Sequence, residues 1–137
     1  MQLEQRREEF GNEDQSWLGS AHGTDSTDNA TLVPALFTAG THYPMGYIPS
    51  GTLLGKVTSV GATQNCYGPY DPAANDGRQT FVGALFTSQA VRGTVTSTTR
   101  VVGSILKHGA IKVARLPIPS QVDNAARTAA AGRIIFE

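Results

Sequence analysis

The sequence predicts a mainly β protein, a small irregular β-barrel with one short helix, preceded by an extended N-terminal arm. The length of 137 residues suits one folded domain, because most domains hold about 100–150 residues. Charged residues make up only 16% of the chain, against about 25% in an ordinary soluble domain. Short runs of Val, Ile, Thr and Phe alternate with Gly and Pro, which favours short strands joined by tight turns.

The first 30 residues are predicted to form the arm. Between Met1 and Asp28 there are seven acidic and two basic residues, a net charge of −5, whereas the rest of the chain has nine basic and four acidic residues, a net charge of +5. Few large apolar side chains interrupt this acidic stretch, and residues 19–29 have the small, polar composition of a linker. We therefore assign residues 1–30 to the arm and residues 31–137 to the domain.

An arm without its own core can become ordered by adding a strand to the edge of a partner protein. Large apolar side chains would anchor it, because aromatic residues dominate the binding energy of interfaces, and acidic side chains would meet basic residues of the partner. The predicted anchors are Phe10, Trp17 and Leu18, and the predicted acidic contacts are Glu8, Glu9, Glu13 and Asp14. The alternative is that Phe10 and Trp17 pack against the chain's own domain.

Five short apolar or alternating runs in the rest of the chain predict strands. They cover residues 52–58, 81–87, 100–106, 110–116 and 133–136. Gly55, Gly83 and Gly103 lie inside three of these runs. A glycine inside a strand often marks a bulge or the close approach of another backbone segment, so an irregular barrel fits better than a flat sheet.

One helix is predicted near the C-terminus. Ser120 is placed as its N-cap, with Asp123 at the spacing of a capping box, and Gly132 as its C-terminal cap. Small apolar side chains recur at helical spacing and would form one face: Val122, Ala125, Ala126, Ala129 and Ala130. A face made almost entirely of alanine buries little area, so this helix must pack on the sheet to persist.

The sequence predicts no catalytic residue, no metal site and no cofactor. Residues 51–57 (GTLLGKV) have three residues between the glycines, where a phosphate-binding loop needs four, and Val where Ser or Thr would bind magnesium. The three histidines lie twenty or more positions apart, and the single Cys66 permits no internal disulfide. Asp71, Asn75 and Asp76 lack the alternate-position acids of a calcium loop, and we interpret them as capping turn amides.

Nucleic acid, membranes and small-molecule substrates are not predicted partners. The chain has a formal net charge of zero, and the basic residues of the domain are dispersed among apolar runs. No apolar run approaches the roughly 20 residues of a membrane span. The charged start, MQLEQRREEF, lacks the apolar stretch of a secretion signal, so we expect synthesis in the cytoplasm.

The order of the motifs indicates a family. YIPSGTLLGKVT at residues 47–58 precedes YGPYDPAANDG at residues 67–77, and VGALF, VVGSIL and GAIKV follow. This succession resembles the lambda-type bacteriophage head decoration family over roughly residues 31–137. The motif residues for which the resemblance implies a structural role are Ile48, Pro49, Gly51, Gly55, Tyr67, Pro69, Tyr70, Asp71, Pro72, Asp76 and Gly77.

The resemblance implies a small β-tulip domain that is structural and not an enzyme. It implies homotrimers on the outer surface of the virion head, at threefold and quasi-threefold positions, where they contact the major capsid protein. There they would clamp neighbouring capsomers against the pressure of packaged DNA.

Two alternatives remain at this point. One is another structural module of the virion, a minor capsid, tail or fibre protein. The other is a small hydrolase or carbohydrate-binding barrel that uses Tyr70, Asp71 and Asp76, which requires a concave site with convergent polar groups.

Overall fold

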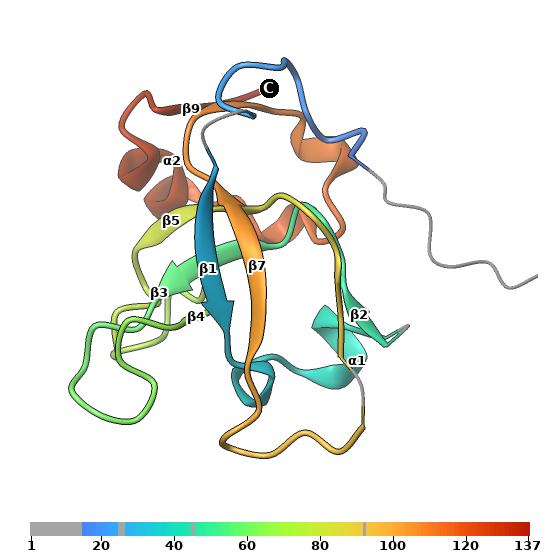
Figure 1. Ribbon diagram of the computed structural model, residues 1–137. Helices are drawn as coiled ribbons and strands as arrows, with labels where there is room; N and C mark the ends of the chain where they lie inside the picture. Colours follow the sequence, from blue (N-terminus) through green and yellow to red (C-terminus); the bar gives the residue numbers. More distant parts are fainter. Residues whose placement is uncertain (1–14, 25–26, 45, 92) are drawn as a thin grey trace, which may run out of the picture.

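The computed structural model describes residues 15–24, 27–44, 46–91 and 93–137. Within these residues the chain is mainly β (Figure 1). The strands are β1 (Asp28–Leu32), β2 (Tyr47–Ile48), β3 (Leu53–Lys56), β4 (Tyr67–Pro69), β5 (Phe81–Leu85), β6 (Gln89–Ala90), β7 (Val101–Leu106), β8 (Gly109–Ile111) and β9 (Ile134–Phe136). The helices are α1 (Ala39–His42) and α2 (Asn124–Ala130), and short 3-10 helices cover Pro34–Leu36, Val113–Arg115 and Pro119–Gln121.

Five strands close into a barrel in the order β1-β4-β3-β5-β7. β1 is antiparallel to β7 from the pair Asp28–Ile105 to the pair Leu32–Val101, and Figure 1 shows the two strands side by side. Leu32 also pairs in parallel with Tyr67 of β4, which closes the ring. The predicted fold class, mainly β with a small barrel and one short helix, is confirmed. Because closure pairs the strand edges, the barrel resists strand addition by another chain.

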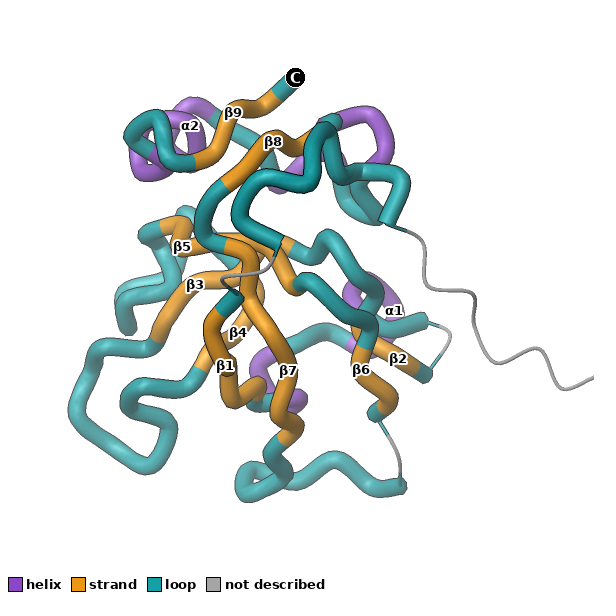
Figure 2. Tube along the Cα trace, turned by 45° about the horizontal axis from the view of Figure 1, so that its top comes forward, coloured by secondary structure: helices purple, strands orange, loops and turns teal. Residues whose placement is uncertain are grey.

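A smaller layer covers one end of the barrel. β8 and β9 pair in parallel, and Leu18 forms an antiparallel bridge with Ile111 on the opposite side of β8. α2 packs against β5 and β9. Figures 1 and 2 both show this layer at the end of the barrel that lies away from the loops of residues 57–66 and 93–100.

Consecutive side chains of the barrel strands face two different hydrophobic clusters. Leu53, Ala84 and Leu106 belong to a cluster shared with the end layer, whereas their neighbours Leu54 and Leu85 belong to a cluster inside the barrel. Side chains of a strand point alternately to its two faces, and here both faces are covered by apolar groups. This explains why the strands are nearly continuous apolar runs in the sequence.

Two of the three strand glycines, Gly55 and Gly83, allow close backbone contact as predicted, whereas Gly103 lies against the side chains of Gln89 and Leu85. The register between β3 and β5 shifts between Leu54 and Gly55, which is a β-bulge or a related irregularity. A Cβ atom on Gly55 would lie 2.6 Å from the carbonyl oxygen of Arg78, and one on Gly83 would clash with the carbonyl oxygen of Leu106. Larger residues at these two positions would therefore force the backbone apart.

The strand predicted over residues 110–116 is only partly correct. β8 ends at Ile111, and the Lys112 N–H still donates to the Trp17 carbonyl oxygen as part of the antiparallel bridge between Leu18 and Ile111. Residues Val113–Arg115 form a 3-10 helix instead of continuing the strand.

The helix begins three residues later than predicted. Asp123 is its N-cap in place of Ser120, since the Asp123 carboxylate accepts the Ala126 N–H at 2.8 Å. Ser120 lies in the preceding 3-10 helix, whose first residue is a proline with a φ angle that suits such a turn. At the other end, Ala131 adopts the left-handed conformation with φ of 49°, and Gly132 follows with φ of 79°. The cap was thus predicted one residue too late.

The folded domain begins earlier than residue 31. β1 starts at Asp28, and Leu18 already pairs with β8. The polar sequence of β1, DNATL, conceals its role, but Ala30 and Leu32 are buried inside the barrel. Its backbone hydrogen bonds are satisfied by β7, about 75 positions later in the chain.

Candidate functional site

Trp17, predicted as an anchor for a partner, is instead fully buried in the core of its own domain. The indole Nε1–H donates to Ser50 Oγ at 3.0 Å, and the Ser50 hydroxyl donates to the Phe86 carbonyl oxygen at 2.6 Å. Gly51 lies against the ring, where a Cβ atom would be 2.9 Å from Trp17 Cδ1. The prediction that Trp17 contacts a partner is therefore corrected, and the alternative, packing on its own domain, holds for this residue.

Leu18 is half-buried and packs against the same core cluster, so it too serves the domain. The N–H of Gly19 donates to the Ala110 carbonyl oxygen at 2.8 Å, which fixes this segment along β8. The other predicted arm contacts lie outside the residues that the structure describes: Phe10, Glu8, Glu9, Glu13 and Asp14.

The motif residues near β2, β3 and β4 lie mostly in the interior. Ile48, Tyr67 and Tyr70 are buried, as are Gly51, Gly55 and Pro69. Pro49 is half-buried, and Pro72 is exposed on the loop that follows β4.

Tyr70 connects the motif loop to the helix. Its hydroxyl donates to Asp123 Oδ1 at 2.7 Å. Burial, together with the hydrogen bond to the Asp123 carboxylate, raises the pKa of Tyr70 to about 12. Burial opposes ionisation of Asp123, but hydrogen bonds from the Ala126 N–H and the Tyr70 hydroxyl outweigh it and lower the pKa of Asp123. The pair is therefore a neutral donor and a charged acceptor at neutral pH.

The end of the motif loop is held by Asp76 and Gly77. The Asp76 carboxylate accepts the Arg78 Nε–H at 3.0 Å. Burial alone would raise the pKa of Asp76, but its contacts with Arg78 lower it. Gly77 has φ of 112°, and a Cβ atom there would lie 2.5 Å from the Lys56 carbonyl oxygen. The turn therefore requires glycine for both its conformation and its space.

These polar side chains do not converge on one point. The Tyr70 hydroxyl and the Asp76 carboxylate each bond a different neighbour, Asp123 and Arg78, and Asp71 accepts a backbone N–H of its own loop. In the part of the chain that the structure describes, no group of three or more His, Cys, Asp or Glu side chains could hold a metal ion. None of the helices described there has the length and apolar character needed to cross a membrane.

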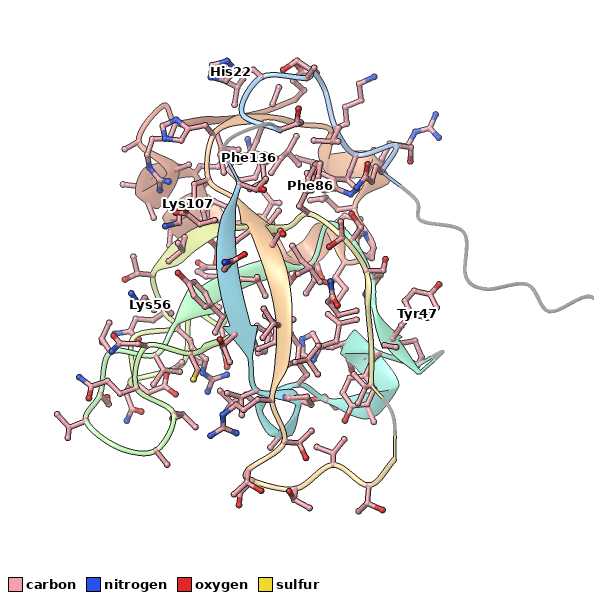
Figure 3. The ribbon with its side chains drawn as sticks, in the orientation of Figure 1. His22, Tyr47, Lys56, Phe86, Lys107 and Phe136 are labelled. Atoms are coloured by element: carbon pink, nitrogen blue, oxygen red, sulfur yellow. The ribbon has the colours of Figure 1, made fainter. Side chains whose placement is uncertain are left out.

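A groove of about 220 Å³ opens on the flank of the barrel near β2. Its walls are mainly proline, aromatic and aliphatic, and we call it the proline groove: Thr41, His42, Pro44, Tyr47, Pro49, Pro117 and Ile118. Figure 3 labels Tyr47 on this flank. Sequence reasoning missed the groove because its walls come from segments about 70 positions apart. The only local signal was the recurrence of proline beside apolar residues.

The end layer is rich in basic side chains. Lys107, which Figure 3 labels at this end, pairs with Asp28 at 2.8 Å, and the Arg127 guanidinium lies 5.5 Å from the ring centroid of Phe136. Other basic residues in or next to the elements of this layer are Lys112, Arg115 and Arg133. Residues 1–14, with five acidic and two basic side chains, join the domain at Gln15 beside this layer. With the acidic residues Asp28, Asp123 and Glu137 counted against these five basic ones, the end layer has a small positive net charge, opposite in sign to that of residues 1–14.

Comparison with known families identifies the chain. A family model described as bacteriophage lambda head decoration protein D matches residues 13–134. The chain belongs to the lambda head decoration protein family. The match covers the barrel, the Trp17 segment and the end layer as far as Ile134, the first residue of β9, so it too includes residues before position 31. No curated protein and no solved structure matches the chain.

The head decoration family is a family of structural capsid proteins and not of enzymes. Membership therefore gives the protein a role in decorating a phage capsid and makes it a component of the virion. The predicted family is confirmed, and the motif loop that suggested it is a hydrogen-bonded element of the fold.

Proposed function

We propose that this head decoration protein is a cementing protein that trimerises on the outer surface of a double-stranded DNA phage head. There it would clamp neighbouring capsomers against the pressure of the packaged DNA. The observation that supports this proposal most directly is the family match over residues 13–134. Its partners would be the major capsid protein and two further copies of the same chain, all made in the host cytoplasm.

The closed barrel favours binding through segments outside it, because its strand edges are already paired. Residues 1–14 are such a segment, and in extended form 14 residues can span up to about 50 Å. Burial of Trp17 fixes the base of this segment to the domain. Strand addition to the capsid protein would use Phe10 as the apolar contact and Glu8, Glu9, Glu13 and Asp14 as the acidic contacts.

Trimerisation would strengthen a weak contact. Each arm is short, but three arms on one trimer would bind as a multivalent unit, which can raise the overall affinity by about 10²–10⁴-fold without any new contact. Arms that leave one trimer in three directions would reach different capsid subunits, and this is how the trimer would clamp neighbouring capsomers.

Binding to expanded, DNA-free capsid shells tests the proposal. Co-sedimentation followed by electron microscopy should show density at threefold and quasi-threefold positions in high copy number. Binding to tails in place of heads would point to another structural module of the virion, and the cementing role would then be rejected.

Removing residues 1–14 should lower shell binding by about 10²-fold or more, while the circular dichroism spectrum of the domain stays unchanged.

Replacing Glu8 and Glu9 by Gln should weaken binding and reduce its dependence on salt, because exposed charges are screened. Asp71→Asn is the matched control, since it removes one acidic charge from the exposed side of the motif loop and leaves the arm intact. Full-strength binding by the truncated protein would refute the role of the arm.

A further inference from the structure

We infer that the Phe10 side chain occupies the proline groove of its own domain when the protein is free of the capsid. This inference concerns the same arm as the proposed function, but it does not depend on capsid binding. The groove would then be a second site, besides that of Trp17, at which the N-terminal segment contacts its own domain.

The base of the arm lies beside the groove. Trp17 packs against Gly51, and a Cβ atom on Gly51 would lie 2.9 Å from the Trp17 ring and 3.0 Å from Pro117, a residue of the groove wall. Ser50, which accepts the indole N–H, directly follows Pro49 on the other wall. The chain is still attached to the domain at Gln15, whose side-chain amide donates to the Phe86 carbonyl oxygen at 2.7 Å.

The length of chain beyond Gln15 is sufficient to reach the groove. Phe10 is five residues away, and five extended residues span up to about 17 Å. A side chain tethered so closely is presented to its site at an effective concentration in the millimolar range. A site that binds a phenyl group with a dissociation constant in the millimolar range or below would then hold it for much of the time. Leu3, twelve residues away, has a much larger volume to explore.

The groove matches a phenyl ring in size and chemistry. Its volume of about 220 Å³ exceeds the ~150 Å³ of a cavity known to bind benzene. Three prolines, Ile118 and the ring of Tyr47 supply apolar contact, and the polar groups among the lining residues belong to Thr41, His42 and the Tyr47 hydroxyl. His42 Nδ1 accepts the Thr38 N–H at 2.8 Å, which holds its ring in place as a wall.

The charges around Phe10 are compatible with this position. Glu8 and Glu9 precede it and Glu13 and Asp14 follow it, so a phenyl ring alone can enter while the carboxylates stay in water at the open mouth. Burial of those carboxylates would be costly. Phe10 is also the largest apolar side chain among residues 1–14, and it is therefore the member of the arm that gains most from docking.

Amide resonances of the full-length protein provide the test. Phe10→Ala should shift the amide signals of Thr41, Tyr47 and Ile118, whereas Leu3→Ala, the matched loss of an apolar side chain from the same arm, should leave them in place. Phe10→Leu should cause a smaller shift than Phe10→Ala. Unmoved groove signals in Phe10→Ala, or equal shifts in Leu3→Ala, would overturn the inference.

A second measurement leaves Phe10 intact. A nitroxide attached to Asn12→Cys, in a Cys66→Ser background that removes the one native thiol, should broaden the amide signals of Tyr47 and Ile118. The signal of Val60, an exposed residue in the loop between β3 and β4 that does not line the groove, should stay sharp. Equal broadening of the Val60 and groove signals would mean that the arm has no preferred position on the domain, which would contradict the inference.

Shell binding of Phe10→Ala separates this inference from the proposed function. If the groove signals move but shells are still bound at full strength, the docked Phe10 is confirmed and its capsid contact is excluded. If shell binding is lost and the groove signals do not move, the docked position is rejected and the capsid contact stands.

Discussion

The Tyr70 hydroxyl donates a 2.7 Å hydrogen bond to Oδ1 of Asp123, 53 positions later in the chain. The same carboxylate oxygen accepts the Ala126 N–H at 2.8 Å and so caps the first turn of α2. One side chain therefore fastens the motif loop, the helix and the end layer together. Because the pKa of Tyr70 is raised to about 12, the hydroxyl remains a donor throughout the neutral range.

Replacing Asp123 should destabilise the domain more than replacing Tyr70. Asp123→Ala removes the N-cap, which costs about 1 kcal/mol, and leaves the Tyr70 hydroxyl without its acceptor, which costs about 1–3 kcal/mol more. Tyr70→Phe keeps the cap and should cost only about 1 kcal/mol. Asp123→Ser is the matched control, because serine still caps a helix but is too short for Tyr70. Denaturant unfolding gives the free energy of unfolding of all three variants. Equal losses of stability for Asp123→Ala and Tyr70→Phe would contradict the conclusion that Asp123 stabilises the fold through both hydrogen bonds.

The same carboxylate should make stability depend on pH in the acid range. The pKa of Asp123 is lowered in the folded state by hydrogen bonds from the Ala126 N–H and the Tyr70 hydroxyl, against the opposing effect of burial. A lowered folded pKa contributes stability that is complete above the unfolded value, near pH 4, and is lost as pH falls through the folded pKa. Asp123→Asn should therefore be less stable than the parent at pH 7, and the difference should narrow below about pH 4. A constant difference from pH 7 to pH 2 would disprove this linkage.

Two glycines should respond to alanine in opposite ways. Gly77→Ala places a Cβ atom 2.5 Å from the Lys56 carbonyl oxygen in a backbone with φ of 112°, so we expect a loss of about 2 kcal/mol or more. Gly40 lies in α1, and no heavy atom lies within 4 Å of a Cβ atom built there. Gly40→Ala should be neutral or stabilise the fold by up to about 1 kcal/mol. Thermal unfolding of the two variants, measured side by side, would reject the argument if both lost stability equally.

The sequence was informative where apolar runs were short and bounded by glycine. The runs that contain β3, β5, β7 and β9 are each nearly continuous and apolar, because many of their side chains pack in one of the two hydrophobic clusters, although Val102 of β7 and Ile135 of β9 are exposed. β1 was missed for the opposite reason, since DNATL is polar and its partner β7 lies far along the chain. Tertiary pairing, and not local propensity, makes it a strand.

Among the candidate site residues, Trp17 was misjudged because its surroundings in the sequence are acidic and polar. Two residues 33 or more positions away account for its burial. The Ser50 hydroxyl accepts the indole N–H, and Gly51 has no side chain where the Trp17 ring packs. The groove was missed for the same reason. Asp123 was predicted as a partner of the helix cap, but only the structure shows that it is the cap itself and the acceptor of Tyr70.

Because Trp17 and Leu18 are part of the fold, two N-terminal deletions that end on either side of them should differ strongly in their free energy of unfolding. Removal of residues 1–14 leaves the hydrogen bond of Trp17 and the bridge of Leu18 in place and should change the free energy of unfolding by less than about 1 kcal/mol. Removal of residues 1–18 also deletes Trp17, which is fully buried, and should cost about 3–5 kcal/mol, the range for loss of a core aromatic side chain. Trp17→Ala in the full chain should lose somewhat less than the longer deletion, which also removes Leu18 and its bridge to Ile111. Trp17→Phe should lose less than Trp17→Ala, because it keeps part of the ring and loses the bond to Ser50. Urea unfolding followed by circular dichroism gives the free energy of unfolding of the four variants. Equal stability of the two deletions would contradict the conclusion that Trp17 is part of the domain core.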